Sequence, residues 1–137
     1  MEPEIRAARP DDVEAVRELW GGSRSAHALT EDTPERVGVA VAAGALLVAV
    51  VDGAVVGALV AGFDGWRGNM YRLAVAEQWR RRGIGRRLVA AGHERLRSLG
   101  APRVTALVAF DDAGARGFWE AVGYAGDPVM GRMVRDL

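Results

Sequence analysis

Five arginines surround two glycines in the segment Gln78–Leu88, which reads QWRRRGIGRRL. An arginine guanidinium can bind a phosphate through two parallel hydrogen bonds. Gly83 and Gly85 let an anion approach the backbone because no Cβ stands in its way. The segment joins a predicted strand to a predicted helix, and the start of a helix offers unpaired N–H groups and a partial positive charge. The sequence therefore predicts a pyrophosphate-binding loop at the start of a helix.

Two common nucleotide-binding loops do not fit this segment. A Walker loop requires a lysine after its last glycine, and all eighteen basic residues of this chain are arginine. A Rossmann loop requires a third small residue, at a position where this segment has Leu88. The pattern therefore disfavours ATP and NAD as ligands. The alternative to a phosphate site is a solvated turn whose arginines lie on the exposed face of a helix.

The composition of the chain limits the classes of function. With 137 residues, half of them hydrophobic, we expect one globular domain over residues 1–137. The formal net charge of zero disfavours nucleic acid as a partner. The absence of cysteine and the wide separation of His27 and His93 disfavour a metal site. The acidic start lacks the apolar segment of a signal peptide, and the apolar stretch Val39–Val51 is too short to span a membrane. We therefore expect a cytoplasmic protein with neither a metal nor a membrane partner.

Capping residues delimit two predicted helices in the N-terminal third of the chain. Asp11 is expected to cap the first helix, with Glu14 completing a capping box. This helix is expected to end at Gly21–Gly22. Thr33 is expected to cap the second helix, which should end at Gly44.

Valine-rich runs predict the strands of a sheet. Asp52-Gly53 separates two such runs, and this dipeptide is a strong signal of a two-residue hairpin turn. The remaining predicted elements are strands over Glu4–Ala8, Met70–Ala76 and Arg103–Phe110, helices over Gly83–Leu99 and from Asp111 or Asp112 to Val122, and a last strand in the C-terminal segment.

The predicted order of elements is β-α-α-β-β-β-α-β-α-β. The strand–helix–strand run in the second half indicates a parallel pair with a crossover helix. The hairpin indicates antiparallel pairing before it. We therefore expect an α/β fold in which helices flank a mixed sheet.

The pattern R-x-x-G-x-G at Arg80–Gly85 resembles the loop with which the GNAT superfamily of N-acetyltransferases holds the pyrophosphate of acetyl-CoA. The segment Asp111–Tyr124, DDAGARGFWEAVGY, resembles the second signature of that family. The likeness extends from about Glu4 to the C-terminus. The segment Ala61–Val75, AGFDGWRGNMYRLAV, also resembles a bacterial branch of the family, the YpeA-like acetyltransferases. The resemblance implies a GNAT-like mixed β-sheet flanked by helices, with acetyl-CoA (coenzyme A) as the cofactor.

The resemblance also implies which residues bind acetyl-CoA. Backbone N–H groups of the loop would bind the pyrophosphate, and the strand at Leu73–Val75 would pair with the pantetheine amides. This strand is expected to splay from the next one, leaving a slot for the cofactor. Asp112 stands where the family usually has asparagine, and helix capping is its alternative role. The implied cofactor-binding residues are Leu73, Ala74, Val75, Arg80, Arg81, Arg82, Gly83, Ile84, Gly85, Arg86, Asp112, Ala115, Phe118 and Trp119.

Two positions depart from the family pattern at the implied catalytic residues. Trp119 stands where the family often has a tyrosine that protonates the leaving thiolate, and an indole N–H is not a usable acid. Its alternative role is that of a core aromatic residue. Asn69 stands where some members have a glutamate base, and an amide cannot take the proton. Tyr71, or a water relay to Asp64, Glu31 or Asp32, would have to replace that base.

The acceptor implied by the family is a primary amine of a small molecule or peptide, which attacks the thioester carbonyl directly. Acidic side chains in the acceptor site would attract a cationic amine. The candidate acceptor-binding residues are Trp20, His27, Glu31, Asp64 and Trp66. The departures at Asn69 and Trp119 leave a second hypothesis open, a CoA-binding module with little or no transferase activity. The protein is expected to be a monomer or a homodimer.

Overall fold

A computed structural model describes residues 2–23 and 31–137. The chain forms two compact units, Met1–Leu107 and Val108–Leu137. The first unit contains a five-stranded sheet and three of the α-helices, and the second contains one α-helix followed by a C-terminal segment. The single domain over 1–137 stays a prediction.

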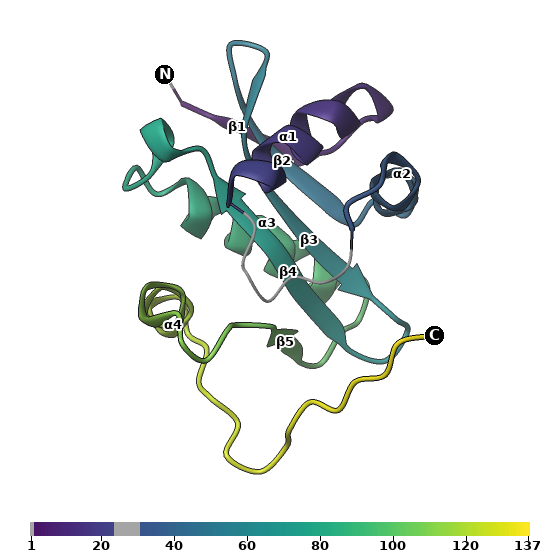
Figure 1. Ribbon diagram of the computed structural model, residues 1–137, viewed down its shortest axis with the longest axis vertical. Coiled ribbons are helices and arrows are strands. Elements are labelled where there is room, and N and C mark those ends of the chain that lie inside the picture. Colours follow the sequence, from purple (N-terminus) through teal and green to yellow (C-terminus); the bar gives the residue numbers. More distant parts are fainter. Residues whose placement is uncertain (1, 24–30) are drawn as a thin grey trace. The chain divides into compact units, whose positions relative to one another are not determined.

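The sheet has the strand order β1-β2-β3-β4-β5 and is mixed, as the sequence predicts (Figure 1). The first four strands pair antiparallel, and β5 pairs parallel to β4. Asp52 and Gly53 form the turn between β2 and β3 with φ of 50° and 79°, which confirms the predicted hairpin. The strands are β1 (Glu4–Ala7), β2 (Leu46–Val51), β3 (Ala54–Phe63), β4 (Gly68–Val75) and β5 (Val104–Ala106).

Helices cover both faces of the sheet in the first unit (Figure 1). On one face, α1 (Val13–Ser23) and α2 (Pro34–Ala42) bury a core cluster with Ala58 and Val60 of β3. On the other face, α3 (Ile84–Ser98) packs on the alternate residues of β3, including Gly57 and Leu59. The two sets alternate along β3 because successive strand residues point to opposite faces. The sheet therefore has a buried layer on each side.

Two glycines allow α3 to lie close to the sheet. A Cβ on Gly92 of α3 would come within 2.5 Å of Met70 Cε and 3.3 Å of Ala61 Cβ. A Cβ on Gly68 of β4 would come within 2.8 Å of Leu96 Cδ1. Because this packing leaves no room for added atoms, it fixes the first residues of β4 against the helix.

A β-bulge interrupts β4 in its middle. Ala74 lies opposite Ala58 of β3 and Tyr71 lies opposite Val60, so β4 has one more residue than β3 between these pairs. Arg72, inside the bulge, has φ of 58°. Met70 therefore contacts α3, whereas Ala74 joins the core cluster on the α1 face, although the two residues are four apart. An uninterrupted strand would place both on one face.

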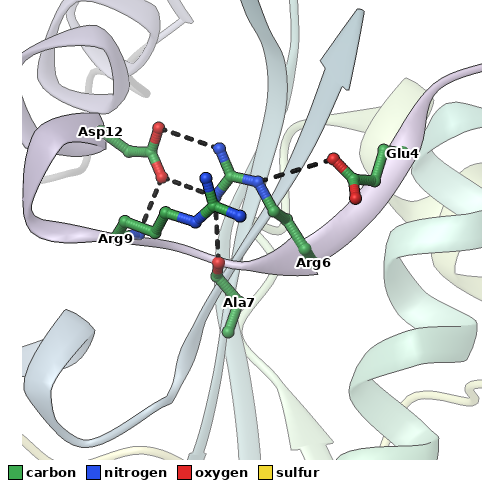
Figure 2. A network of polar contacts seen from close by, with 5 residues as sticks. All are labelled: Glu4, Arg6, Ala7, Arg9 and Asp12. Carbon is green, nitrogen blue, oxygen red and sulfur yellow. Dashed lines mark hydrogen bonds and ion pairs between the residues drawn. The ribbon is translucent and has the colours of Figure 1, made fainter. Parts of the chain in front are cut away.

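The start of the first helix differs from the prediction of a cap at Asp11. A 3-10 turn over Pro10–Asp12 precedes α1, and Arg9 is its N-cap. The Asp12 carboxylate accepts a hydrogen bond from the Arg9 backbone N–H at 2.7 Å and forms an ion pair with Arg6 of β1 at 2.7 Å (Figure 2). Because the ion pair with Arg6 joins β1 to this turn, Asp12 rather than Asp11 makes the capping contact. The helix also continues to Ser23, past the predicted end at Gly21–Gly22.

Two predicted strands also change. The strand predicted over Arg103–Phe110 is reduced to the three residues of β5, which pair with Gly68–Met70. A bulge bends a strand, and the parallel pairing ends where the bulge of β4 begins. The last predicted strand is wrong, because none of the described strands lies after α4. There the Asp127 carboxylate instead accepts hydrogen bonds from the N–H groups of Val129 and Met130, which forms a turn.

The other predicted caps and helices are confirmed. Thr33 Oγ1 accepts the Arg36 N–H at 3.2 Å at the start of α2, and Gly44 follows that helix with φ of 71°. Of the two predicted alternatives, Asp112 and not Asp111 is the N-cap of α4 (Ala113–Ala121). The fold class is therefore the predicted α/β arrangement with a mixed sheet, without the final strand.

Candidate functional site

The start of α3 is the first part of the site. Gly83 is the N-cap residue and has φ of 79°, a left-handed conformation that favours glycine. No side chain caps this helix, and its first turn contains no acidic residue. The first-turn N–H groups of Ile84, Gly85 and Arg86 therefore keep their capacity to bind an anion.

The arginines around the start of α3 are held in different ways. Arg80 donates from Nε to the carbonyl of Val75 at 3.0 Å. The guanidinium carbon of Arg82 lies 4.7 Å from the ring centroid of Trp79, in a cation–π contact. Within the described part of the chain, the guanidinium groups of Arg81 and Arg86 make no hydrogen bond or ion pair. Two of the arginines thus organise the loop, and two leave their guanidinium groups available to a ligand.

The second half of β4 is the second part of the site. In the first half of this strand, which we call the paired half, Gly68, Asn69 and Met70 pair with β5 on one side and β3 on the other. Residues 71–75 pair with β3 but have no strand on the β5 side among the described residues of the first unit. The predicted slot residues Leu73, Ala74 and Val75 all lie in this open half, which leads through the arginine loop to α3.

Tyr71 is the first residue of the open half. It is 40% exposed, and its hydroxyl lies near Gly62 of β3. A Cβ on Gly62 would come within 3.7 Å of the Tyr71 hydroxyl. Asn69, the other candidate on this strand, is half-buried and lies in the paired half, opposite Gly62 and Thr105. The structure therefore places the two predicted catalytic residues of β4 on either side of the point where pairing with β5 ends.

The bulge of β4 is held by contacts that the sequence does not signal. Arg72 forms an ion pair with Asp32 at 3.0 Å, and the indole N–H of Trp20 donates to the Arg72 carbonyl at 2.8 Å. Arg17 in turn donates from Nε to the Asp32 carbonyl at 2.8 Å. Trp20 is buried in the core cluster, so this placement argues against its predicted direct contact with an acceptor.

The acidic candidates differ in what they can do. Hydrogen bonds from the backbone N–H groups of Arg67 and Trp66 lower the pKa of Asp64, which makes its carboxylate a weaker base. This turn presents Trp66, which is 76% exposed. Asp32 is committed to Arg72, whereas Glu31 is exposed. The acceptor candidate His27 lies outside the described residues.

The C-terminal unit contains the second signature. Asp112 Oδ1 accepts the Ala115 N–H at 2.9 Å and so caps α4, the alternative role that its position predicted. Phe118 and Trp119 pack edge to face, with ring centroids 5.4 Å apart, and Trp119 packs in the same way on Tyr124 at 5.0 Å. Burial raises the pKa of Tyr124. Contact of these residues with acetyl-CoA stays a prediction.

In the described ranges 2–23 and 31–137, no cluster of His, Cys, Asp or Glu residues could hold a metal ion. None of the helices in these ranges combines the length and the apolar character that crossing a membrane requires.

Comparison with known proteins decides the family. A model of the Acetyltransferase (GNAT) family matches residues 11–124. This protein belongs to the GNAT family of acetyltransferases. The chain is 34% identical over 124 residues to an acetyltransferase of Pectobacterium atrosepticum, ECA0875, in a match that covers 88% of this chain and 86% of the relative. The family match covers both signatures, so the resemblance to the GNAT superfamily is confirmed, while the likeness to the YpeA-like branch stays a prediction.

Solved structures show the same fold. The PaiA N-acetyltransferase of Thermoplasma acidophilum in complex with coenzyme A matches with a TM-score of 0.81 at 16% identity, covering 96% of this chain and 94% of that one. AAC(6')-Iy, in complex with the bisubstrate analogue CoA-S-monomethyl-acetylneamine, matches with a TM-score of 0.79 at 18% identity, covering 99% and 100%. At these identities the likeness supports the fold alone.

Proposed function

We propose that this GNAT protein transfers an acetyl group from acetyl-CoA to a primary amine. One observation carries the proposal: the open half of β4 leads directly into a helix start that has a left-handed glycine as its N-cap and no capping side chain. The unpaired backbone edge of β4 can pair with the amides of a pantetheine arm, and the uncapped start of α3 can bind a pyrophosphate. The family, and relatives whose structures contain coenzyme A or an analogue, support the same donor.

The residues of the site fit this donor in charge and in space. The position of a Cβ on Gly83 has no atom within 4 Å, so the approach to the helix start is open. The free guanidinium groups of Arg81 and Arg86 can bind phosphate oxygens. We propose the residues of the first unit named from the resemblance, Leu73–Val75 and Arg80–Arg86, as the cofactor site, with Arg80 and Arg82 shaping the loop through Val75 and Trp79.

When bound, acetyl-CoA supplies an acetyl group on a thioester, and transfer to an amine forms a C–N bond while a C–S bond breaks. The N–H groups on the open edge of β4 would polarise the thioester carbonyl. We assign the relay of the amine proton to solvent to the hydroxyl of Tyr71, a partly exposed residue at the start of the open half whose hydroxyl lies near Gly62 of β3. Asn69 and Trp119 can donate hydrogen bonds but cannot take the proton. Much of the rate enhancement would come from positioning the amine against the carbonyl.

The acceptor that we propose is a small-molecule or peptide amine. Glu31 and Trp66 are the exposed candidates for binding it, the first by charge and the second by stacking. Glu31 lines a hollow of about 290 Å³ together with Arg17, Gly21, Asp32 and Thr33. The mixed charge of this lining favours an acceptor that carries polar groups besides its amine.

Calorimetry of acetyl-CoA binding tests the donor. Gly85→Glu places a side chain and a negative charge in the first turn of α3, and we expect the Kd for acetyl-CoA to rise by about 100-fold or more. An acidic residue in a first helical turn is favourable for the helix, so the variant should stay folded. Gly38→Glu is the matched control, because Gly38 lies in α2 with no atom near the position of its Cβ. Equal binding by wild type and Gly85→Glu would contradict the proposed site.

A turnover assay on a panel of amines tests the reaction itself. Release of free CoA that depends on an added amine would support the transferase. Tight binding of acetyl-CoA without turnover on any amine would instead favour the CoA-binding module that the departures at Asn69 and Trp119 suggest.

A further inference from the structure

Arg72 has a backbone conformation that needs support from its surroundings. Its φ of 58° lies in the left-handed region, which costs a residue with a side chain about 1–2 kcal/mol. Such a conformation persists when neighbouring groups hold it in place. In β4 it accompanies the extra residue that moves Ala74 to the face opposite that of Met70. The orientation of the β4 residues after Tyr71 thus depends on the conformation at Arg72.

Contacts from two other segments hold Arg72 at both its side chain and its backbone. The guanidinium pairs with Asp32, which precedes α2, at 3.0 Å, and the two side chains are 20% and 14% exposed. The carbonyl of Arg72 accepts the indole N–H of Trp20 in α1 at 2.8 Å. Arg17 of α1 also donates to the Asp32 carbonyl. Both partners of the ion pair, Arg72 and Asp32, therefore accept a backbone hydrogen bond from a side chain of α1. We call Arg72, Asp32, Trp20 and Arg17 the bulge clamp.

We propose that Arg72 is a positioning residue that, through the bulge clamp, sets the open half of β4 for catalysis. The inference rests on the proposed function, since it assigns to that half the binding of the pantetheine arm and the thioester. Tyr71 precedes the bulge and Leu73–Val75 follow it, so the clamp fixes the hydroxyl and the backbone donors relative to each other. A small shift between such groups can lower a rate by about 100-fold.

The molecule contains a matched ion pair for comparison. Arg6 and Asp12 lie 2.7 Å apart with side chains that are 18% and 12% exposed, but they join β1 to the turn before α1 (Figure 2). The pairs are alike in chemistry and in burial. A variant at Arg6 should therefore change the stability of the fold without changing the geometry of β4.

The test compares Arg72→Met, Arg72→Gly and Arg72→Lys with Arg6→Met. Glycine relieves the backbone strain while removing the ion pair, so Arg72→Gly separates the conformation from the clamp. Lysine keeps one charged hydrogen bond to Asp32 without the planar fork. Each variant is measured for kcat, for KM of acetyl-CoA, and for amide hydrogen exchange over residues 71–75 against exchange over β2.

We expect kcat to fall by about 10- to 100-fold in Arg72→Met and Arg72→Gly, while KM for acetyl-CoA rises by less, about three- to tenfold, because the contacts to the pantetheine arm weaken but the helix start is intact. Exchange over residues 71–75 should become about tenfold faster or more, with β2 unchanged. Arg72→Lys should retain part of the wild-type kcat. Arg6→Met should match the wild type in kcat and in exchange over 71–75.

A wild-type kcat in both Arg72→Met and Arg72→Gly, or an equal loss in Arg6→Met, would overturn the proposal. If only Arg72→Met lost activity and Arg72→Gly kept it, the backbone conformation alone would be responsible and the clamp would be rejected. Failure of the proposed function is separate: a wild type that neither binds acetyl-CoA nor acetylates an amine would reject the function. Exchange over residues 71–75 would still decide whether Arg72 holds the bulge.

Discussion

The two halves of β4 show how one strand supports the fold and then the site. In Gly68–Met70, strands β3 and β5 pair with both sides, and the close packing of α3 leaves no space. In Tyr71–Val75, pairing to β5 has ended, the bulge has turned the side chains over, and Tyr71 reaches solvent. Backbone groups that a neighbouring strand uses cannot bind a ligand. The candidate site begins where pairing on one side stops.

The largest effect that we predict is a loss of stability without a loss of acetyl-CoA binding when Gly68, in the paired half of β4, is substituted. Gly68→Val would place a branched side chain where a Cβ alone comes within 2.8 Å of Leu96. Overpacking of this kind should lower the free energy of unfolding by about 1–3 kcal/mol. The Kd for acetyl-CoA should stay within about threefold of the wild type, since no open-half residue changes. Urea denaturation and calorimetry measure the two quantities, and a large loss of binding in a folded Gly68→Val protein would remove the distinction between the halves.

A smaller effect is predicted at Gly83, on both the free energy of unfolding and the Kd for acetyl-CoA. Gly83→Ala should lower the free energy of unfolding by about 1 kcal/mol because of its left-handed φ, and should weaken acetyl-CoA binding by about tenfold as the helix start shifts. Gly100→Ala is the matched control, because Gly100 has φ of 90° just after the other end of α3, with open space around its Cβ position. Equal binding by the two variants would count against a pyrophosphate site at the helix start that Gly83 caps.

The smallest effect concerns the matched ion pair at β1. The hydrogen bond from Arg6 lowers the pKa of Asp12, so the ionised carboxylate stabilises the fold above its ordinary pKa of about 4. This stabilisation is lost as the pH falls through the lowered pKa of the folded protein. Asp12→Asn should therefore lower the free energy of unfolding by about 1 kcal/mol at pH 7. In urea titrations, the difference from the wild type should shrink below about pH 4, and a constant difference at all pH values would contradict this assignment.

Much of the architecture could be predicted because local chemistry determines it. The Asp52-Gly53 turn, the Thr33 cap and the Asp112 cap each depend on residues adjacent in the sequence, and all are present. The loop before α3 was predicted for the same reason, since its glycines and the helix start are neighbours in the chain.

Features that depend on distant contacts were missed. No sequence signal shows that an arginine takes a left-handed conformation, and Arg72 does so beside Trp20 and Asp32, which are far away in the chain. The length of β5 was overestimated because it depends on the bulge in its partner. The cap at Asp11 was wrong because Arg6 binds the next residue, Asp12. The bulge clamp in particular required the folded structure.

The most direct test of the central claim is an NMR titration of the nitrogen-15-labelled protein with acetyl-CoA. The account predicts that the amide resonances of Leu73–Val75 and Gly83–Arg86 shift with a common Kd, while those of the paired residues Gly68–Met70 shift much less. Shifts confined to other parts of the chain, or equal shifts in both halves of β4, would contradict the claim that acetyl-CoA binds where the pairing of β4 with β5 ends.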